Sequence, residues 1–359
     1  MRALVLRSPG DLKVMDVPVP ALSAGQVLVK VSCCGICGSD VRYFHGENPW
    51  ARQTLGRGEP VPPNIILGHE LTGTVVAAHD SAGEHLVGKR VGINTWTTCG
   101  ICRHCRAGRE NFCANTIHLG HAQGWGAMDF YPGGMAEYCP AWAARVCELP
   151  ETITDEQATF VDPLVSALHA VAVGDVQAGQ TVAVIGGGPI GLLIGQLAKL
   201  RGASVLIADV SAASVAVAEQ VGIDEAVNVA ADPKGLSRRL MDRTAGAGAA
   251  RVFDTIGTSE TIADALAMLD QAGVCVLLAT SGGDIRFPAR LLTGERAIRT
   301  SANSLYSDFP QAIDLLAGGA VKVDPLITHR FALADAEQAF AVADNKAGAG
   351  AVKVLIRCD

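Results

Sequence analysis

The sequence predicts an α/β protein with two parts, a strand-rich part and a part built on a parallel sheet. Up to about residue 150, short apolar runs are bounded by Gly, Pro or Asp, which is typical of strands joined by turns. From about residue 155, apolar runs of five to seven residues alternate with helical stretches, which indicates parallel strands with crossover helices. A length of 359 residues, at roughly 100–200 residues per domain, indicates two domains, with three as the alternative.

The expected elements follow from these runs in order. The first part should contain strands at 3–6, 26–33, 71–78, 90–95 and 135–140. The second should contain strands at 182–185, 204–208, 252–255 and 274–278, with helices at 189–201, 212–221 and 260–269. After about residue 297 the alternation ends, and we expect a helix at 310–317, a strand containing Ile327 and a terminal strand at 352–357.

Composition excludes several classes of protein. The 29 basic residues are outnumbered by 36 acidic ones, and the basic stretches are short and scattered, so nucleic acid is not an expected partner. The most apolar window, 181–198, contains glycines and a proline that fit a strand turning into a helix, so we expect no membrane span. The N-terminal apolar run is too short for a signal peptide, and the 11 cysteines are clustered, so we expect a reducing, cytoplasmic location.

A glycine-rich turn follows the first strand of the second part, at residues 186–191. Gly186 would allow the tight turn, Gly188 the approach of a cofactor's pyrophosphate, and Gly191 close packing of helix on strand. The next strand ends in Asp209, whose carboxylate suits an adenosine ribose; the alternative is a turn of another α/β domain with an ordinary exposed aspartate. The predicted cofactor-binding residues are Gly186, Gly188, Pro189, Ile190, Gly191 and Asp209.

Two sets of residues have the chemistry of metal ligands. Four cysteines lie within 15 residues, at Cys99, Cys102, Cys105 and Cys113. Their short spacing lets one loop surround a tetrahedral ion, zinc by preference, in a closed structural site; the alternative is four free buried cysteines. Cys37 and the pair His69-Glu70 are far apart in sequence, but a thiolate, an imidazole and a carboxylate on one zinc would leave a position for water or an alcohol.

Together these motifs resemble the zinc-dependent medium-chain alcohol dehydrogenase superfamily over nearly the whole chain. The segment GICGSDV at 35–41 and Glu70 are most similar to its sorbitol and threonine dehydrogenase branch. The resemblance implies a GroES-like catalytic domain formed by residues 1–155 and 297–359. It also implies an inserted Rossmann domain for NAD at 156–296, an active site in the cleft between the two domains, and a homodimer or homotetramer.

The resemblance also assigns roles in the catalytic site. Cys37 and His69 match zinc ligands, and Glu70 matches a ligand or an exchanging near-ligand. Ser39 matches the hydroxyl that passes on the alcohol's proton. Asp162 falls where polyol dehydrogenases usually have glutamate and threonine dehydrogenases aspartate, so we expect it to face the zinc; the alternative is that it only caps the following helix.

Two features depart from these relatives. Arg42 stands where a histidine often forms part of the proton path to solvent. The segment 43–64, with Trp50 and two arginines, is longer than the usual connection. A group of aromatic residues could line an apolar pocket for a cyclic or aromatic alcohol, or could simply pack beneath long loops: Trp50, Trp96, Trp125, Phe130 and Tyr131.

The predicted function is reversible oxidation of a secondary alcohol to a ketone, with one catalytic and one structural zinc and with NAD as hydride acceptor. The substrate would be a polyol, a cyclic alcohol or a hydroxy amino acid. NAD is expected over NADP because Asp209 repels a 2′-phosphate and residues 210–213 contain no arginine. The alternatives are a primary alcohol or aldehyde dehydrogenase of the same fold, and a non-catalytic protein that binds zinc and a nucleotide. A zinc-independent quinone reductase would lack the four-cysteine loop.

Overall fold

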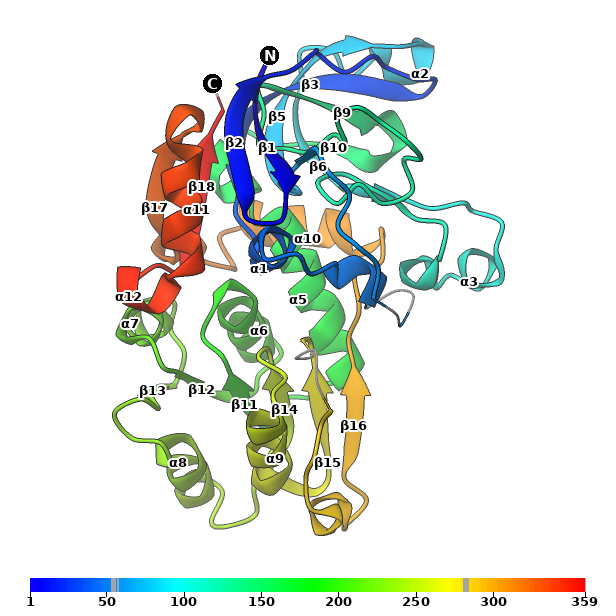
Figure 1. Cartoon of the computed structure of the whole chain (residues 1–359). Coiled ribbons are helices and arrows are strands. Elements are labelled where there is room, and N and C mark those ends of the chain that lie inside the picture. The colour runs from blue at the N-terminus through cyan, green and yellow to red at the C-terminus, as the bar shows by residue number, and fades with distance from the viewer. Residues whose placement is uncertain (53–55, 57, 280–283, 359) are drawn as a thin grey trace.

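The computed structural model describes residues 1–52, 56, 58–279 and 284–358, and it has two lobes, one above the other in Figure 1. The lower, parallel-sheet lobe contains a six-stranded sheet in the order β13-β12-β11-β14-β15-β16. Its strands are β11 (Thr181–Ile185), β12 (Ser204–Asp209), β13 (Glu225–Asn228), β14 (Ala249–Asp254), β15 (Leu269–Leu277) and β16 (Ala297–Thr300). All neighbouring strands are parallel, and the order reverses beside β11, which is where this class of sheet binds nucleotides.

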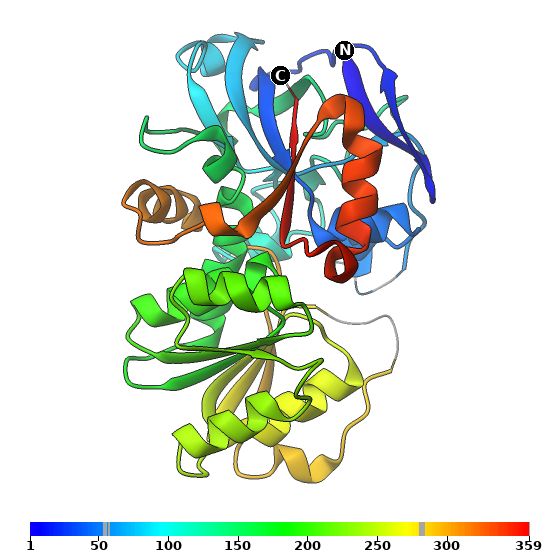
Figure 2. The same cartoon turned by 90° about the vertical axis from the view of Figure 1, so that its left-hand side faces the viewer.

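Helices cover both faces of this sheet, as Figure 2 shows. They are α5 (Val161–Gly174), α6 (Pro189–Leu200), α7 (Ala212–Gln220), α8 (Gly235–Arg243) and α9 (Ser259–Met268). Successive residues of a strand point to opposite faces: Val205 and Ile207 pack in the core with α5 and α6, whereas Leu206 packs with α8 and α9. Because both faces are buried, the inner strands consist of almost continuous apolar residues.

The upper, strand-rich lobe contains two sheets. A three-stranded sheet has the order β2-β1-β4, and a seven-stranded sheet has the order β10-β6-β5-β3-β18-β17, with β9 also paired to β3. The strands are β1 (Arg2–Ser8), β2 (Asp11–Asp16), β3 (Gln26–Gly35), β4 (Ile65–Ile66), β5 (Glu70–Ala78), β6 (Arg90–Ile93), β9 (Tyr138–Trp142), β10 (Val146–Glu148), β17 (Ile327–Ala332) and β18 (Lys353–Arg357). A separate pair consists of β7 (Trp96–Thr97) and β8 (Ile117–His118).

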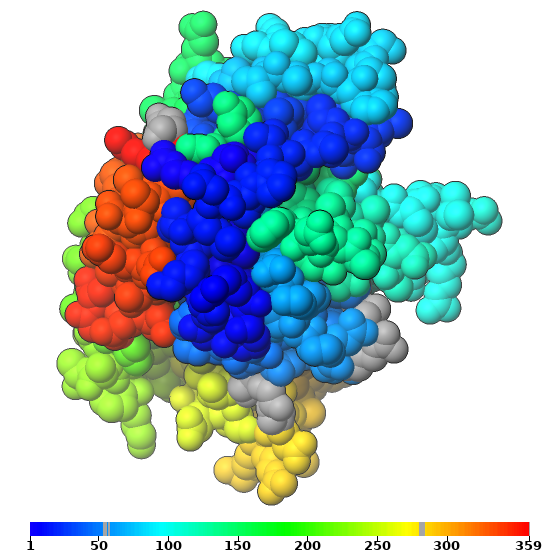
Figure 3. Space-filling model, turned by 45° about the horizontal axis from the view of Figure 1, so that its top comes forward, coloured from blue at the N-terminus to red at the C-terminus, as the bar shows by residue number. Residues whose placement is uncertain are grey.

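The two ends of the chain meet in this lobe. The last strand, β18, pairs with β3, with Leu355 opposite Gly35. Figure 3 shows the C-terminal segment, in orange and red, lying against the N-terminal segment in blue. The short helices of the lobe are α1 (Gly38–Phe44), α2 (Ser81–Glu84), α3 (Arg103–Arg106), α4 (Asp155–Ala158), α11 (Ala336–Asp344) and α12 (Lys346–Ala349), and α10 (Asp308–Ala317) packs on α5.

Some elements differ from the sequence prediction. Strand β16 pairs with β15, so the parallel sheet extends past residue 296, where we expected its domain to end. Strand β13 and helix α8 were not expected, because a four-residue strand and an arginine-rich helix carry weak apolar patterns. Among the described residues no helix is long and apolar enough to cross a bilayer, and the apolar window 181–198 is divided between β11 and α6.

Candidate active site

Asp40 brings together the two segments that carry the predicted catalytic ligands. Its buried carboxylate accepts hydrogen bonds from the backbone N–H of Cys37, at 2.9 Å, and of Gly68, at 3.2 Å. Gly68 has φ +97°, and a Cβ there would lie 2.6 Å from the sulfur of Cys34, so only glycine fits. Asp40 therefore holds the start of helix α1 beside Gly68, the residue that precedes His69.

Cys37, His69 and Glu70 form one group, with ligand atoms that all lie within 4.8 Å of one another. The Ser39 hydroxyl is 3.3 Å from Nε2 of His69, and the other ring nitrogen, Nδ1, is 3.4 Å from Asp40 Oδ1. A thiol, an imidazole and a carboxylate are ligands that zinc prefers, and a carboxylate behind the imidazole is a common way of orienting a histidine ligand. The residues present therefore fit a catalytic zinc ion.

The charges of Cys37 and His69 depend on each other. Burial alone would raise the pKa of the Cys37 thiol, but the adjacent His69 outweighs burial and lowers that pKa to about 6. Burial would lower the pKa of His69, but Asp40 and Cys37 outweigh it and raise that pKa. The two shifts favour a thiolate beside a charged imidazole, and zinc would compete with a proton for the imidazole nitrogen.

Lys353, on the last strand, is a residue of this site that was not predicted from the sequence. Its Nζ forms an ion pair with Glu70 Oε2 and donates a hydrogen bond to the carbonyl of Ile36 at 3.3 Å. Burial lowers the pKa of Lys353 to about 8, although Cys37 and Asp40 oppose this shift. A lysine inside the apolar run 351–356 was the available signal.

Asp162 lies in the first turn of α5 and is not its cap. The helix begins at Val161, and the cap position is Phe160, so the alternative that Asp162 merely caps the helix is wrong. Pro163 fits in the first turn of this helix because the N–H that a proline lacks is not needed there. Burial raises the pKa of Asp162 to about 6. The charge of His69 lowers this pKa, and the charge of Cys37 raises it. Asp162 is thus near Cys37, His69 and Glu70, which we call the zinc-ligand group, but its carboxylate is not part of the set within 4.8 Å.

Two further histidines pack against His69. The rings of His118 and His121 are stacked with their centroids 4.2 Å apart, and His121 is 4.4 Å from His69 and 4.9 Å from Tyr43. Burial, together with His69, lowers the pKa of His118 to about 3, and burial also lowers the pKa of His121. The signal for them was the short segment HLGH at 118–121.

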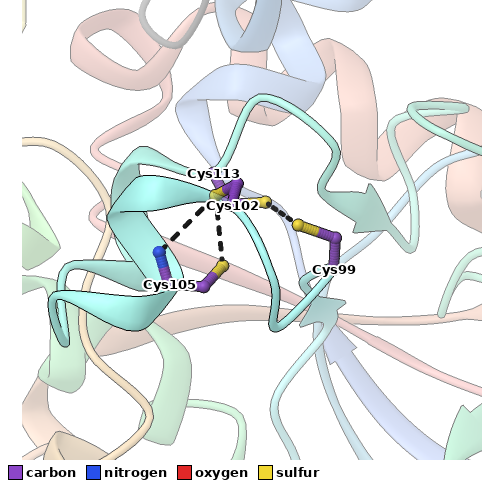
Figure 4. A group of neighbouring side chains, drawn as sticks. All are labelled: Cys99, Cys102, Cys105 and Cys113. Atoms are coloured by element: carbon purple, nitrogen blue, oxygen red, sulfur yellow. Dashed lines mark hydrogen bonds between the residues drawn. The ribbon is translucent and has the colours of Figure 1, made fainter.

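The four cysteines of the loop between β7 and β8 converge on one point (Figure 4). The sulfurs of Cys102 and Cys105 are 3.5 Å apart, and those of Cys99 and Cys113 are 3.6 Å apart. Four thiolates that bind zinc at about 2.3 Å would place their sulfurs about 3.8 Å from one another. The cysteines are free thiols, and hydrogen bonds from the backbone of Ile101 and Cys102 lower the pKa of Cys99 to about 6. The loop therefore fits a closed zinc site.

The glycine-rich turn lies at the end of β11, with Gly188 at the cap of α6 and Pro189 opening the helix. A Cβ on Gly191 would lie 1.9 Å from the carbonyl oxygen of Gly186, whereas a Cβ on Gly188 would meet nothing within 4 Å. Close packing therefore requires Gly191, and the open side at Gly188 leaves room for a ligand. Asp209 ends β12 and accepts hydrogen bonds from the N–H groups of Gly187, at 2.6 Å, and Ser211, at 2.7 Å.

Three of the aromatic side chains pack within the protein. Trp50 is buried, Trp96 lies beneath the guanidinium of Arg145, and Trp125 stacks on Trp142. This favours packing over an apolar pocket at these positions. Arg42 forms an ion pair with Glu47 at 2.9 Å. Of the two arginines in the long segment, Arg52 pairs with Glu47 too, and Arg57 lies outside the described residues.

Comparison with known proteins identifies the family. Residues 23–151 match the alcohol dehydrogenase GroES-like domain, and residues 189–318 match the zinc-binding dehydrogenase domain. The chain is 30% identical to sorbitol dehydrogenase of Rattus norvegicus, over 99% of this chain and 96% of the relative. It is 31% identical to an L-threonine 3-dehydrogenase of Escherichia coli, over 95% of each.

Solved structures give the same result. A putative zinc-binding dehydrogenase of Sinorhizobium meliloti bound to NADP superposes with a TM-score of 0.86 and 32% identity, over 99% of this chain and 98% of that one. An Escherichia coli dehydrogenase complexed with NADH superposes with a TM-score of 0.85 and 27% identity, over 99% of each. The chain therefore belongs to the zinc-type alcohol dehydrogenase family, with a GroES-like domain and a Rossmann-like domain.

Proposed function

We propose that this protein oxidises a secondary alcohol to a ketone with NAD and contains one catalytic and one structural zinc. The observation that carries the proposal is the group Cys37, His69 and Glu70, with the Ser39 hydroxyl directly beside it. Sorbitol and threonine dehydrogenases, which the chain resembles throughout its length, support a secondary alcohol as substrate.

Each residue of the site has its own role in this reaction. When bound, zinc supplies the Lewis acidity that lowers the pKa of an alcohol's hydroxyl, and NAD supplies the hydride acceptor. Cys37 and His69 would hold the metal, with Glu70 as a ligand or near-ligand, and Asp40 orients the imidazole. Ser39 would accept the proton of the substrate hydroxyl, since its Oγ lies beside Nε2 of His69, the ring nitrogen that faces away from Asp40.

The choice of NAD over NADP rests on Asp209. Its carboxylate is held at the end of β12 by two backbone N–H groups, so a negative charge faces the place where a ribose would bind. Residues 210–213 offer no arginine for a 2′-phosphate. The two solved relatives contain NADP and NADH respectively, so the family allows both, and the ratio of kcat/KM for the two cofactors is the direct test. Comparable values would overturn this assignment.

The experiment for the whole proposal is metal analysis combined with an activity screen. The purified chain should contain two zinc ions and form NADH with at least one polyol, cyclic alcohol or hydroxy amino acid. Cys37→Ser should abolish turnover while the structural zinc is retained. Absence of zinc from a folded, active protein, or no turnover with any secondary alcohol, would refute the proposal.

A further inference from the structure

The stacked pair His118 and His121 has no role in the reaction proposed above, yet it lies against the zinc-ligand group. His121 exposes 7% of its surface, and neither of its ring nitrogens has a hydrogen-bond partner. Buried polar atoms without partners are rare, because each has lost its hydrogen bonds to water. An unpaired imidazole between His69 and Tyr43 therefore indicates that something polar completes it.

The hydrogen bonds of His118 determine which of its nitrogens is available. Its Nδ1 lies 2.6 Å from the carbonyl oxygen of Leu119, and a carbonyl can only accept, so Nδ1 carries the proton. The remaining nitrogen, Nε2, is therefore an acceptor in the neutral ring. Neither ring nitrogen of His121 has a partner, and an imidazole with one proton offers one donor and one acceptor. The pair thus presents groups that suit a hydroxyl, which both donates and accepts, better than an anion or an alkyl group.

A metal ion is a weaker explanation for the unpaired ring. Ligand atoms of Asp40, His69 and His121 do lie within 4.8 Å of one another. However, Asp40 already accepts hydrogen bonds from Cys37 and Gly68, and its place behind His69 is that of an orienting group. The ring of His121 lies 4.4 Å from that of His69, so a molecule bound beside His69 would lie next to it.

We propose that His118 and His121 recognise a second hydroxyl of the substrate, on the carbon next to the one that is oxidised, so that the substrate class is a vicinal diol or polyol. This inference rests on the proposed function, because it places the reacting hydroxyl at the group of Cys37, His69 and Glu70. A substrate without the second hydroxyl would leave His121 unpaired, and sites built to bind a hydroxyl discriminate strongly against analogues that lack it.

The test uses 2,3-butanediol and 2-butanol, which differ by one hydroxyl, with the zinc-loaded protein. The ratio of kcat/KM for the diol to that for the mono-alcohol should fall about tenfold in His121→Leu. His121→Asn supplies N–H donors and a carbonyl acceptor and should restore much of the ratio. Tyr43→Phe is the matched control, because it keeps the ring that packs on His121 and loses only a hydroxyl bonded to Asn48.

A binding measurement separates failure of this inference from failure of the proposed function. The dissociation constants of 2,3-butanediol and 2-butanol are measured by NMR titration of the zinc-loaded protein in the presence of NADH. Across the variants, the ratio of these constants should change in parallel with the ratio of the kcat/KM values. Preferential binding of the diol without any turnover would refute the proposed function and leave the inference standing. An unchanged ratio in His121→Leu, no preference for the diol in the unmodified protein, or loss of the catalytic zinc from His121→Leu would each overturn the inference.

Discussion

The ion pair between Lys353 and Glu70 ties the last strand of the chain to the zinc-ligand group. The two side chains are only 1% and 4% exposed. Lys353→Met would leave the Glu70 carboxylate buried without its partner, which costs about 3–5 kcal/mol. We therefore expect a clear fall in the unfolding temperature of the zinc-free protein, and Lys353→Arg, which keeps the charge, should lose less. Equal unfolding temperatures for Lys353→Met and the unmodified protein would contradict the pairing.

Asp162 predicts a pH dependence of defined sign. Burial raises its pKa from 3.8 to about 6, so between these values the folded chain keeps a proton that the unfolded chain releases. The stability that this carboxyl contributes is therefore greatest below pH 3.8 and falls as the pH rises to about 6. In the zinc-free protein, Asp162→Asn should be more stable than the unmodified chain at neutral pH by about 3 kcal/mol, and equally stable near pH 4. Urea unfolding at the two pH values measures this difference.

The zinc-loaded form tests the other role of the same residue. If Asp162 faces the metal, Asp162→Asn should lose zinc or turnover, because a neutral amide is a poor zinc partner. Full zinc content together with unchanged turnover would exclude the metal role.

Among single residues, those with distinctive chemistry could be predicted from the sequence. Those whose role depends on their position in the fold could not. Cys37 and His69 could be paired from the sequence alone, because few residue types bind zinc and the surrounding motifs resemble a known family. Lys353 and His121 could not, since only the folding of β18 and of the loop after β8 brings them to the zinc-ligand group. A lysine in an apolar strand indicates a buried partner but does not name it.

The turn between β11 and α6 allows two glycines to be compared within one element. Gly191→Ala would place a Cβ 1.9 Å from the carbonyl oxygen of Gly186, so the turn must shift, and both stability and NADH affinity should fall. Gly188→Ala meets nothing within 4 Å and should keep its unfolding temperature, while NADH affinity falls because the Cβ occupies the side left open for the pyrophosphate. Calorimetric titration and thermal unfolding measure the two effects. Equal behaviour of the two variants would contradict this division of roles.

The four-cysteine loop has few contacts of its own that would fix its shape in the absence of a metal. Residues 99–113 contain one four-residue α-helix, α3, one 3₁₀ turn at Glu110–Phe112 and little apolar core, so bound zinc would supply most of the stability of the loop. Cys102→Ser should therefore lower the unfolding temperature and remove one zinc per chain, with a smaller effect on turnover than Cys37→Ser. A Cys102→Ser protein that keeps both metals and its stability would exclude the structural site.

Strands that are buried on both faces were predicted more accurately than half-exposed edge strands. The inner strands β11, β12 and β14 are apolar on both faces and were placed from the sequence within a few residues. The edge strands β13 and β16 have only four residues each, and they are half-exposed, so their sequences lack the apolar run that marks a strand. Strand β9 begins at Tyr138, three residues later than expected.

In the molecule as a whole, the pairing of strands that are far apart in the sequence could not be predicted from the apolar pattern of each segment. Strand β18 lies between β3 and β17, so the strand-rich lobe needs residues from both ends of the chain. Nothing in the apolar pattern of the terminal strand indicates this partner, and the expectation came only from the resemblance to a known family. The position of Glu70 beside Lys353 depends on the same long-range pairing.

The loop that contains the four cysteines also contacts the segment by which the chain returns from the parallel-sheet lobe. Glu110 accepts a hydrogen bond from the backbone N–H of Tyr306 at 3.0 Å and forms an ion pair with Arg145 at 3.2 Å. The guanidinium of Arg145 lies 4.6 Å from the centre of the Tyr306 ring. The next residue, Asn111, donates a hydrogen bond to the carbonyl of Ala302 at 3.1 Å. The cysteine loop is therefore part of the joint between the two lobes.

Glu110→Ala should weaken that joint. It removes the acceptor of the Tyr306 N–H and leaves Arg145, 14% exposed, without its counterion, at a cost of about 1–3 kcal/mol. Because the lost contacts connect the lobes, we expect calorimetry to show a broadened or divided unfolding transition at a lower temperature. Glu148→Ala is the matched control, since its ion pair with Lys89 is exposed and contributes little. Removal of zinc from the loop should reproduce the effect of Glu110→Ala, because the position of Glu110 depends on the folded loop. A Glu110→Ala protein that unfolds like Glu148→Ala would show that the joint is held elsewhere.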